Sequence, residues 1–153
     1  MLAFKEWAFV VEALATGRQT VILRKGGIAE EDGDFFLREK KFVLMPTLFH
    51  QATDLIKKDW YEEIKNTVYL PDNLSTEIRY QATVTKHCII ESEEELLALD
   101  TLHVWKPAVV LERFNRWKQH KVHCLYVEVT ALPSPILLEM KPEYGGCKSW
   151  IEI

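Results

Sequence analysis

Residues 14–24, Leu-Ala-Thr-Gly-Arg-Gln-Thr-Val-Ile-Leu-Arg, change from a helical to an extended pattern. Residues 3–15 place apolar side chains at the spacing of one helix face, which predicts an amphipathic helix. Gly17 follows, and glycine accepts the left-handed conformation that commonly ends a helix. Residues 20–24 are β-branched and apolar, and this predicts a strand buried on both faces. The chain is therefore predicted to combine helices and strands from its first residues onward.

Outward from that stretch, strand and helix patterns do not alternate regularly. The predicted strands are 20–24, 41–45 (ended by Pro46), 76–90, 122–130 (ended by Pro133 and Pro135), 136–140 and 150–153. The predicted helices are 3–15, 53–65, one that begins at a capping box of Ser92 and Glu95, and 107–118. This order predicts one α+β domain over 1–153, with a curved mixed sheet or small β-barrel and three or four helices.

Composition excludes several classes of protein. The chain has 153 residues, 48% of them hydrophobic, with 19 basic and 23 acidic side chains and a net charge of −4. This balance excludes a disordered chain and a protein coated in cations. Because no run of about 18 apolar residues and no secretory leader pattern is present, we expect no membrane partner. Cys88, Cys124 and Cys147 have no paired spacing, and this favours the reducing cytoplasm.

The first candidate site is the start of the first predicted strand. Strand alternation places Arg18, Thr20 and Arg24 on one face, with Gln19 and Lys25 beside them. Guanidinium and hydroxyl groups at one strand edge suit a phosphate, a carboxylate or the edge of a base. The alternative is a strand whose ends carry solvated arginines. The site prediction requires these groups to share one concave hollow.

The second candidate site is a basic and aromatic segment, residues 103–123. Five lysines and arginines against one glutamate give 5 − 1 = +4 in a chain whose net charge is −4. Clustered cations attract a phosphate backbone, and aromatic faces stack on bases. On a helix over 107–118, Arg113, Arg116 and Trp117 would flank the first site. The alternative is that the aromatic stripe packs in the core while the arginines reach water.

Residues 14–24 resemble the helix-to-strand signature of ASCH domains, which are small β-barrels related to the PUA fold. The resemblance implies a cleft for RNA, a nucleotide or a modified nucleoside. Some ASCH proteins are amidohydrolases that use a lysine just before the threonine and a second threonine two residues after it. Gln19 and Ile22 occupy those positions here, so neither the base nor the hydroxyl is present.

A second resemblance covers nearly the whole chain. Lys5-Glu6-Trp7, residues 23–28, Pro46-Thr47 with His50-Gln51, and residues 143–150 resemble the bacterial family called domain of unknown function 1802. This resemblance implies no established activity. It loosely implies that members of the family form one part of a two-domain restriction-type nuclease.

A nuclease of that type needs two or three carboxylates and a lysine at one sheet edge, where Mg²⁺ activates water. The best candidates are Glu139 and Lys141, and Glu128 on the preceding strand. The alternative is that these are solvated charges at strand ends. Cys88 and Cys124 lie in apolar strands rather than at the spacing of zinc ligands, so no metal site is predicted.

The interpretation is a module that binds RNA, DNA or a nucleotide and needs no cofactor. Its predicted binding residues are Arg18, Gln19, Thr20, Arg24, Lys25, His50, Arg113, Arg116 and Trp117. His50 would read a base edge or hold a water, or else cap the following helix. Two alternatives stay open: a metal-dependent nuclease or other hydrolase using Glu128, Glu139 or Lys141, with Mg²⁺, and a module that binds a protein partner.

Overall fold

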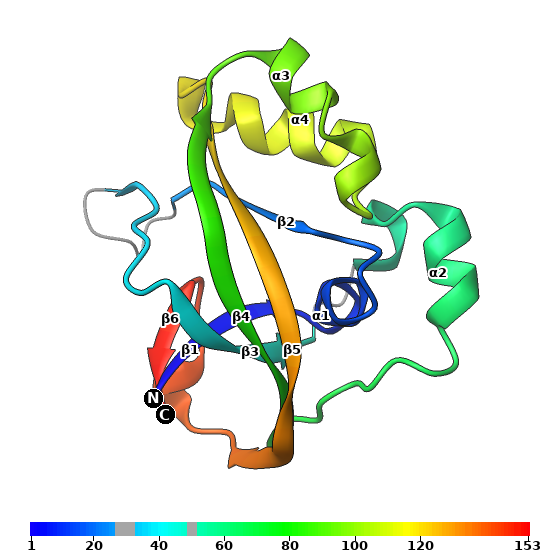
Figure 1. The fold of residues 1–153 in the computed structure, drawn as a ribbon, viewed down its shortest axis with the longest axis vertical. Helices are drawn as coiled ribbons and strands as arrows, with labels where there is room; N and C mark the ends of the chain where they lie inside the picture. The colour runs from blue at the N-terminus through cyan, green and yellow to red at the C-terminus, as the bar shows by residue number, and fades with distance from the viewer. Residues whose placement is uncertain (27–32, 49–51) are drawn as a thin grey trace.

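The computed structural model describes residues 1–26, 33–48 and 52–153, which form a six-stranded mixed sheet in the order β2-β5-β4-β3-β1-β6 (Figure 1). The strands are β1 Leu2–Trp7, β2 Val21–Arg24, β3 Lys41–Thr47, β4 Ser75–Ile90, β5 Val122–Glu139 and β6 Trp150–Glu152. Only β1 and β3 pair in parallel among the described strands. The predicted α+β class and curved mixed sheet are confirmed. The sheet is not closed into a barrel, because β2 and β6 lie at its two ends.

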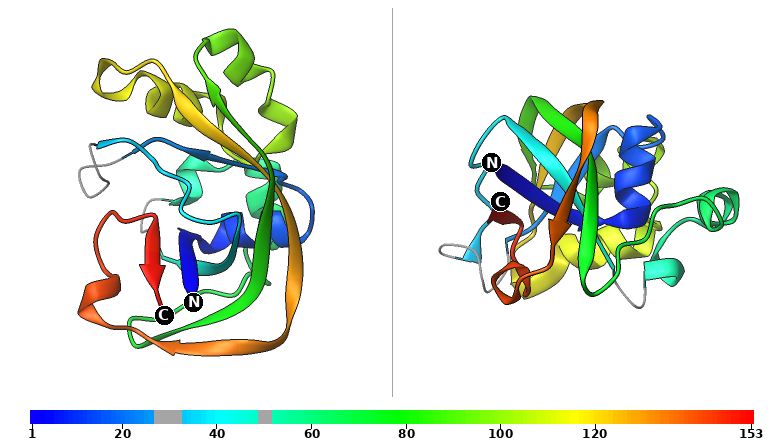
Figure 2. Two further views of the ribbon diagram at one scale, coloured as in Figure 1. Left: turned by 60° about the vertical axis from the view of Figure 1, so that its left-hand side comes forward. Right: turned by 90° about the horizontal axis from the view of Figure 1, so that it is seen from below.

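The long pair β4 and β5 bends along its length, as Figure 2 shows. The pairing shifts register between Ile78 and Tyr80 and again between Val84 and Lys86. The prediction that Pro133 and Pro135 end a strand is wrong, because β5 continues through both prolines to Glu139. Tyr80 pairs with Ala131 and Ile78 pairs with Ile136, so both prolines lie in the irregular stretch between these pairs. A proline lacks the N–H that a regular ladder requires and is tolerated at such an irregularity.

The helices are short. They are α1 Ala8–Ala15, η2 Ala52–Leu55, α2 Lys58–Ile64, α3 Glu93–Leu97, η3 Asp100–Leu102, α4 Pro107–Asn115, η4 Arg116–Lys118 and η5 Pro142–Tyr144. The predicted capping box is confirmed, since the Glu95 N–H donates to the Ser92 hydroxyl at 3.1 Å. None of the described helices is long and apolar enough to cross a membrane.

Three predicted elements have different boundaries in the structure. Residues 2–7 form β1 instead of the first half of a helix, because β3 and β6 pair with them on both sides. The predicted helix over 53–65 is divided at Ile56, which forms an isolated bridge with Trp105. Strand β3 continues through Pro46, because its pairing with β4 has already ended at Leu44 and β4 requires no N–H there.

Both faces of the adjacent strands β1 and β3 carry buried side chains. The larger core lies on one face, where α1 and α4 pack, and its buried members include Phe4, Leu44 and Trp105. A smaller core on the opposite face contains Ala3 and Met45 among others. Because neighbouring residues of β1 alternate between the two cores, the strand carries apolar side chains on both faces.

Gly26, which follows β2, lies against the backbone of Gly33 and Asp34. A Cβ atom at Gly26 would be 2.3 Å from the Asp34 Cα and from the Gly33 oxygen, whereas Gly17, with φ +75°, has open space around it. We expect Gly26→Ala to lower the free energy of unfolding by about 3 kcal/mol through overpacking. Gly17→Ala should cost about 1 kcal/mol through its left-handed backbone. Urea unfolding of the two variants provides the measurement, and equal losses would contradict the close approach.

A buried histidine makes stability depend on pH. His103 is 3% exposed, and its Nδ1 accepts the Trp105 N–H at 3.2 Å. Burial lowers the pKa of His103 from 6.5 to about 4, with the Lys57 ammonium adding to the shift and the Asp100 carboxylate opposing it. The unfolded chain therefore takes up a proton near pH 6.5 that the folded chain does not bind until about pH 4.

The contribution of neutral His103 to stability is thus complete above pH 6.5 and is lost as the pH falls toward 4. We expect the urea midpoint of the wild-type protein to decrease over this range. His103→Asn keeps an acceptor for the Trp105 N–H without a titrating ring, so its midpoint should decrease less steeply. Parallel pH profiles of the two proteins would contradict this assignment.

Candidate functional site

A cleft of about 1240 Å³ opens between the end of β2, β1, α4 with η4, and the loop that follows η5. Its apolar lining includes Leu23, Leu55 and Val109, and its polar lining is dominated by cations. The charged side chains that line it are Lys5, Arg24, Lys25, Arg113, Arg116 and Lys148 against Asp72 and Glu112. Among the described residues this gives 6 − 2 = +4, whereas the whole chain carries −4.

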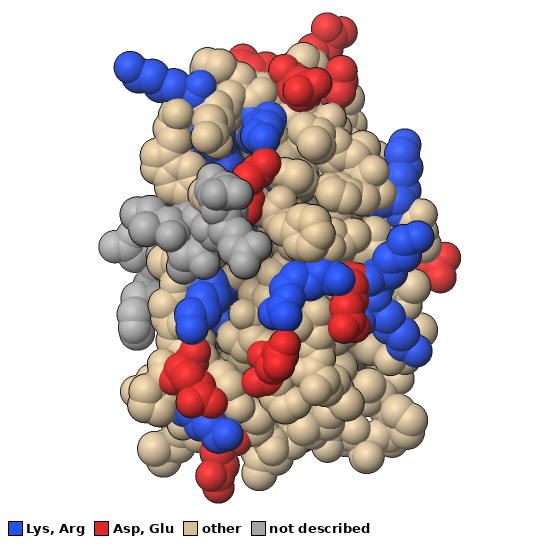
Figure 3. Space-filling model, turned by 90° about the vertical axis from the view of Figure 1, so that its left-hand side faces the viewer, with Lys and Arg blue, Asp and Glu red and all other residues tan. Residues whose placement is uncertain are grey.

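This cationic surplus is not general to the surface. Figure 3 shows a face on which the Lys and Arg side chains are interspersed with Asp and Glu side chains. The described cations of the cleft outnumber its described anions three to one. The charge of the cleft therefore suits an anion.

Arg24, the last residue of β2, lies at the base of the cleft. Its guanidinium pairs with the Glu6 carboxylate at 3.4 Å, donates to the Lys5 carbonyl and lies 4.6 Å from the centre of the Phe4 ring. Glu6 is only 5% exposed, so this pair is shielded from water. The Arg24 Nε is buried and has no hydrogen-bonding partner among the described residues. The guanidinium of Arg24 is thus held against β1, while its charge adds to that of the cleft.

Arg113 projects from α4 into the same cleft. Its guanidinium lies 4.2 Å from the centre of the Trp105 ring and 5.8 Å from that of Trp7. Burial lowers the pKa of Arg113 to about 10; Glu6 opposes this shift, while Arg24 adds to it. No described residue gives Arg113 a hydrogen bond or an ion pair. The arginine is held by stacking, and its N–H donors remain available to a ligand.

Lys25 and Arg116 line the cleft but are already bonded. The Lys25 ammonium donates to the Phe114 carbonyl at 2.7 Å and to the Gln119 carbonyl. Burial lowers the pKa of Lys25, and the nearby Arg116 adds to the effect. Arg116 forms two hydrogen bonds with the Glu112 carboxylate, at 2.9 and 2.6 Å. Both cations contribute positive potential to the cleft, and each has fewer free donors than Arg113.

The structure separates the residues of the first predicted site. Arg18 lies outside the cleft, 3.7 Å from Glu63 and 5.6 Å from the centre of the Trp60 ring. Thr20 is exposed and does not line the cleft. The alternation that was expected to bring both residues beside Arg24 fails because β2 begins only at Val21.

Gln19 is an internal residue and does not line the cleft. It is 2% exposed, its Nε2 donates to the Val21 carbonyl at 2.9 Å, and its Oε1 accepts the Val104 N–H at 3.1 Å. The prediction that this side chain reads a base therefore does not fit its position. His50 lies outside the described residues. The predicted residues that the structure does bring together in the cleft are Arg24, Lys25, Arg113, Arg116 and Trp117.

The candidates for a nuclease site do not converge. Glu128 pairs with Thr83 in the sheet, whereas Glu139 pairs with Ser75 near the other end of β5. The Lys141 ammonium lies over the Tyr144 ring, 5.6 Å from its centre. The described residues contain no group of three or more His, Cys, Asp or Glu side chains that could hold a metal ion.

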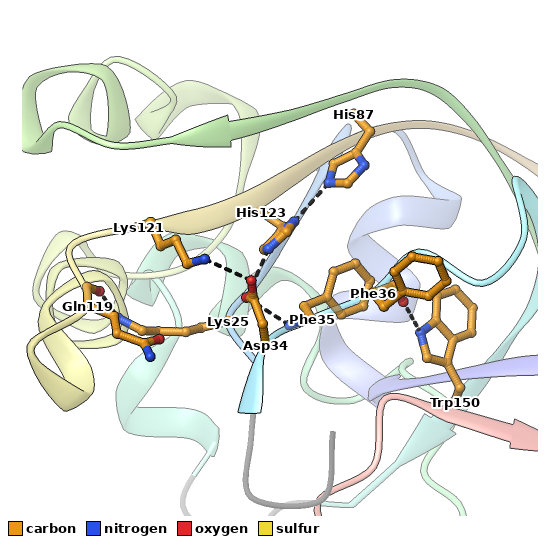
Figure 4. A network of polar contacts seen from close by, with 9 residues as sticks. All are labelled: Lys25, Asp34, Phe35, Phe36, His87, Gln119, Lys121, His123 and Trp150. Carbon is orange, nitrogen blue, oxygen red and sulfur yellow. Dashed lines mark hydrogen bonds and ion pairs between the residues drawn. The ribbon is translucent and has the colours of Figure 1, made fainter. Parts of the chain in front are cut away.

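The sequence patterns did not predict a polar network that lies beside the cleft. The His123 Nε2 lies 3.1 Å from the Asp34 carboxylate, and its Nδ1 lies 2.9 Å from the His87 Nε2 (Figure 4). The Lys121 ammonium donates to the same carboxylate at 2.7 Å. Burial raises the pKa of Asp34, but hydrogen bonds from Lys121 and His123 outweigh it, so the net shift is downward.

This network fastens the segment that contacts Gly26 to β5. Its members come from a loop, β4 and the start of β5, and no motif spacing links them in the sequence. Lys5, which donates to the carbonyls of Tyr144 and Gly146 at 2.7 and 2.8 Å, was also missed as a cleft residue. Its position depends on β1, which the sequence pattern assigns to a helix.

Removing the buried amide of Gln19 tests its structural role. Gln19→Leu should lower the free energy of unfolding by about 1–3 kcal/mol, because it leaves the Val104 N–H and the Val21 carbonyl unpaired in the core. Gln81→Leu removes a hydrogen bond from an exposed sheet face and should change stability by about 0.5 kcal/mol or less. Urea unfolding provides the comparison. Equal stability of the two variants would contradict the internal role.

Comparison with known proteins agrees with both resemblances. A family model described as domain of unknown function (DUF1802) matches residues 3–153. The crystal structure of ASCH from Zymomonas mobilis resembles this fold with a TM-score of 0.52 and 8% identity, covering 99% of this chain and 86% of that chain. No curated protein matches the chain.

Two point mutants of the same Zymomonas mobilis protein have TM-scores of 0.53 and 0.51 with 9% and 10% identity. The alignments cover 93% of this chain in both cases, and 89% and 76% of the mutant chains. At these identities the likeness shows the fold alone. The fold is ASCH-like, as the sequence resemblance predicted.

Proposed function

Because this chain belongs to the DUF1802 family, which is described only as a domain of unknown function, we propose its function from the cleft: it binds nucleic acid or a nucleotide, whose phosphate contacts Arg113 and Arg24. The observation that carries the proposal is the environment of Arg113. This cation is partly desolvated, lies close enough to Arg24 and Arg116 to feel their charge, and has no ion-pair partner among the described residues. A phosphate group supplies the missing negative charge.

The donors at the base of the cleft match a phosphate in kind. A guanidinium presents its N–H groups in a planar fork that bonds two oxygens of one phosphate. The ring of Trp105 fixes the orientation of the Arg113 fork, so little conformational entropy is lost when a ligand binds. Arg24 also lines the cleft and adds a second positive charge there. The two arginines thus form a preorganised site for an anion.

The ASCH-like fold supports the same ligand class, because the resemblance implies a cleft for RNA or a nucleotide. It does not support amidohydrolase chemistry. Gln19 is bonded inside the core and Ile22 is fully buried, so neither position offers a reactive group to the cleft. The proposal is therefore recognition of the ligand, without a reaction assigned to it.

We also propose that this recognition takes place in the cytoplasm. The cysteines Cys88, Cys124 and Cys147 are all free, and Cys147 is exposed. Exposed free thiols persist in a reducing compartment. RNA, DNA and nucleotides are all accessible there in a bacterial cell.

The proposal is tested by titrating the protein with a fluorescein-labelled single strand of about 12 nucleotides, a length within known site sizes. We expect wild-type binding to weaken as salt is raised. Arg113→Gln should weaken binding about tenfold or more and reduce the salt dependence by about one unit of slope. Arg113→Lys keeps the charge but loses the planar fork, so its affinity should lie between those of the wild type and Arg113→Gln.

Arg18→Gln is the matched control, because it removes the same charge from an exposed arginine outside the cleft. It should leave affinity and salt dependence close to wild type. Binding that is equally weak in Arg18→Gln and Arg113→Gln would indicate general surface attraction. No binding by the wild-type protein would overturn the proposal. Circular dichroism of each variant establishes that it is folded.

A further inference from the structure

The turn that ends α4 has an unusual backbone. Trp117 has φ 56° and ψ 25°, and Lys118 has φ 55°. These are the only non-glycine residues with positive φ in the described chain. Two consecutive left-handed residues with bulky side chains are disfavoured and persist only where surrounding contacts hold them. The turn therefore indicates that the position of one of these side chains matters.

Lys25 supplies the contact that holds this turn. Its ammonium donates to the carbonyls of Phe114 and Gln119, which lie on either side of the left-handed pair. Figure 4 shows the Lys25 side chain extending to Gln119. The Asn115 Nδ2 also donates to the Glu93 carboxylate at 3.0 Å, and its Oδ1 accepts a hydrogen bond from the His120 Nδ1 at 2.8 Å. Side chains from two other parts of the chain, Lys25 and Glu93, thus hold the turn.

The effect of the turn is to place Trp117 at the cleft. Trp117 lines the cleft and is 49% exposed, whereas Trp60, Trp105 and Trp150 are buried. Arg116 is bonded to Glu112 and lies 5.8 Å from the centre of the Trp117 ring. An exposed tryptophan held beside a phosphate-binding pair is placed to stack on a planar ring of the same ligand.

We propose that Trp117 is a stacking surface for an unpaired base and that Lys25 is the positioning residue that holds it there. This inference rests on the proposed function and narrows its ligand to nucleic acid with unpaired bases. A duplex hides the faces of its bases within the stack, so only an unpaired base can lie against an indole ring. Single strands are therefore preferred to duplexes of the same phosphate content.

The test compares two labelled strands of about 12 nucleotides, one of thymidines and one of abasic residues with the same phosphates. Trp117→Leu should weaken binding of the thymidine strand about tenfold and leave binding of the abasic strand unchanged. Trp117→Phe keeps a ring and should recover most of the loss. Phe36→Leu removes another exposed aromatic ring, outside the cleft, and should affect neither strand.

The role of Lys25 is tested with the same strands. Lys25→Met should weaken binding of the thymidine strand at least as much as Trp117→Leu does. Because it also removes one charge from the cleft, it should weaken binding of the abasic strand slightly, and the binding that remains shows that the cleft is folded. Lys25→Arg restores two donors and should rescue the loss. Lys118→Met removes an equal charge from the same turn without breaking the two hydrogen bonds from Lys25. It should weaken binding of the two strands slightly and to the same extent.

Quenching of tryptophan fluorescence by the bound strand provides a second measurement, and a change of charge alone would not alter it. The thymidine strand should quench wild-type emission more than Trp117→Phe emission, and Lys25→Met should lose this extra quenching while Lys118→Met keeps it. Equal weakening of both strands by Trp117→Leu would overturn the stacking role and leave the phosphate site standing. Duplex bound as tightly as the single strand would overturn the narrowed ligand class. Failure of the wild-type protein to bind either strand would overturn this inference together with the proposed function.

Discussion

The buried carboxylate of Glu6 opposes the charges of two arginines at the cleft, Arg24 by an ion pair and Arg113 through its electric field, and this constraint organises the rest of the site. Glu6 forms an ion pair with Arg24 and is also the principal opposing charge felt by Arg113. One carboxylate does not neutralise two guanidinium groups, so a positive charge remains on side chains that are partly buried. Such a surplus is unfavourable in the empty protein and becomes favourable when an anion binds. The electrostatic repulsion that destabilises the free protein would thus be relieved by a bound anion and would add to the affinity for it.

The order of the strands brings these groups together. Strand β1 lies between β3 and the edge strand β6, and Glu6 is held opposite Pro46 of β3. Strand β2 pairs with the beginning of β5, where Arg24 lies opposite His123. Only a short connection separates that part of β5 from η4, so the end of β2 necessarily lies beside the turn after α4. Residues far apart in the sequence therefore meet in the cleft because of pairing in the sheet, and the network around Asp34 reinforces the same corner.

Sequence patterns predicted those features that depend on local chemistry. The long strand β4, the cap at Ser92 and the cationic character of residues 103–123 each follow from neighbouring residues. Patterns failed where tertiary pairing overrode local preference. The apolar spacing of residues 2–7 fits one face of a helix, but the same residues are buried on both faces of a strand. Gln19 has the polarity of a ligand-binding residue, and only the structure reveals its bonds inside the core.

Adjacent residues at the end of β2 connect the two parts of the cleft. Arg24 ends β2 and Lys25 follows it, and the two side chains are directed to different neighbours. Arg24 reaches the base of the cleft and pairs with Glu6, whereas Lys25 reaches the turn that carries Trp117. A displacement of β2 would therefore move the proposed phosphate site and the proposed stacking surface together. Because β2 is held by β5 along its whole length, the spacing between the two is set by the sheet and is preorganised before a ligand arrives.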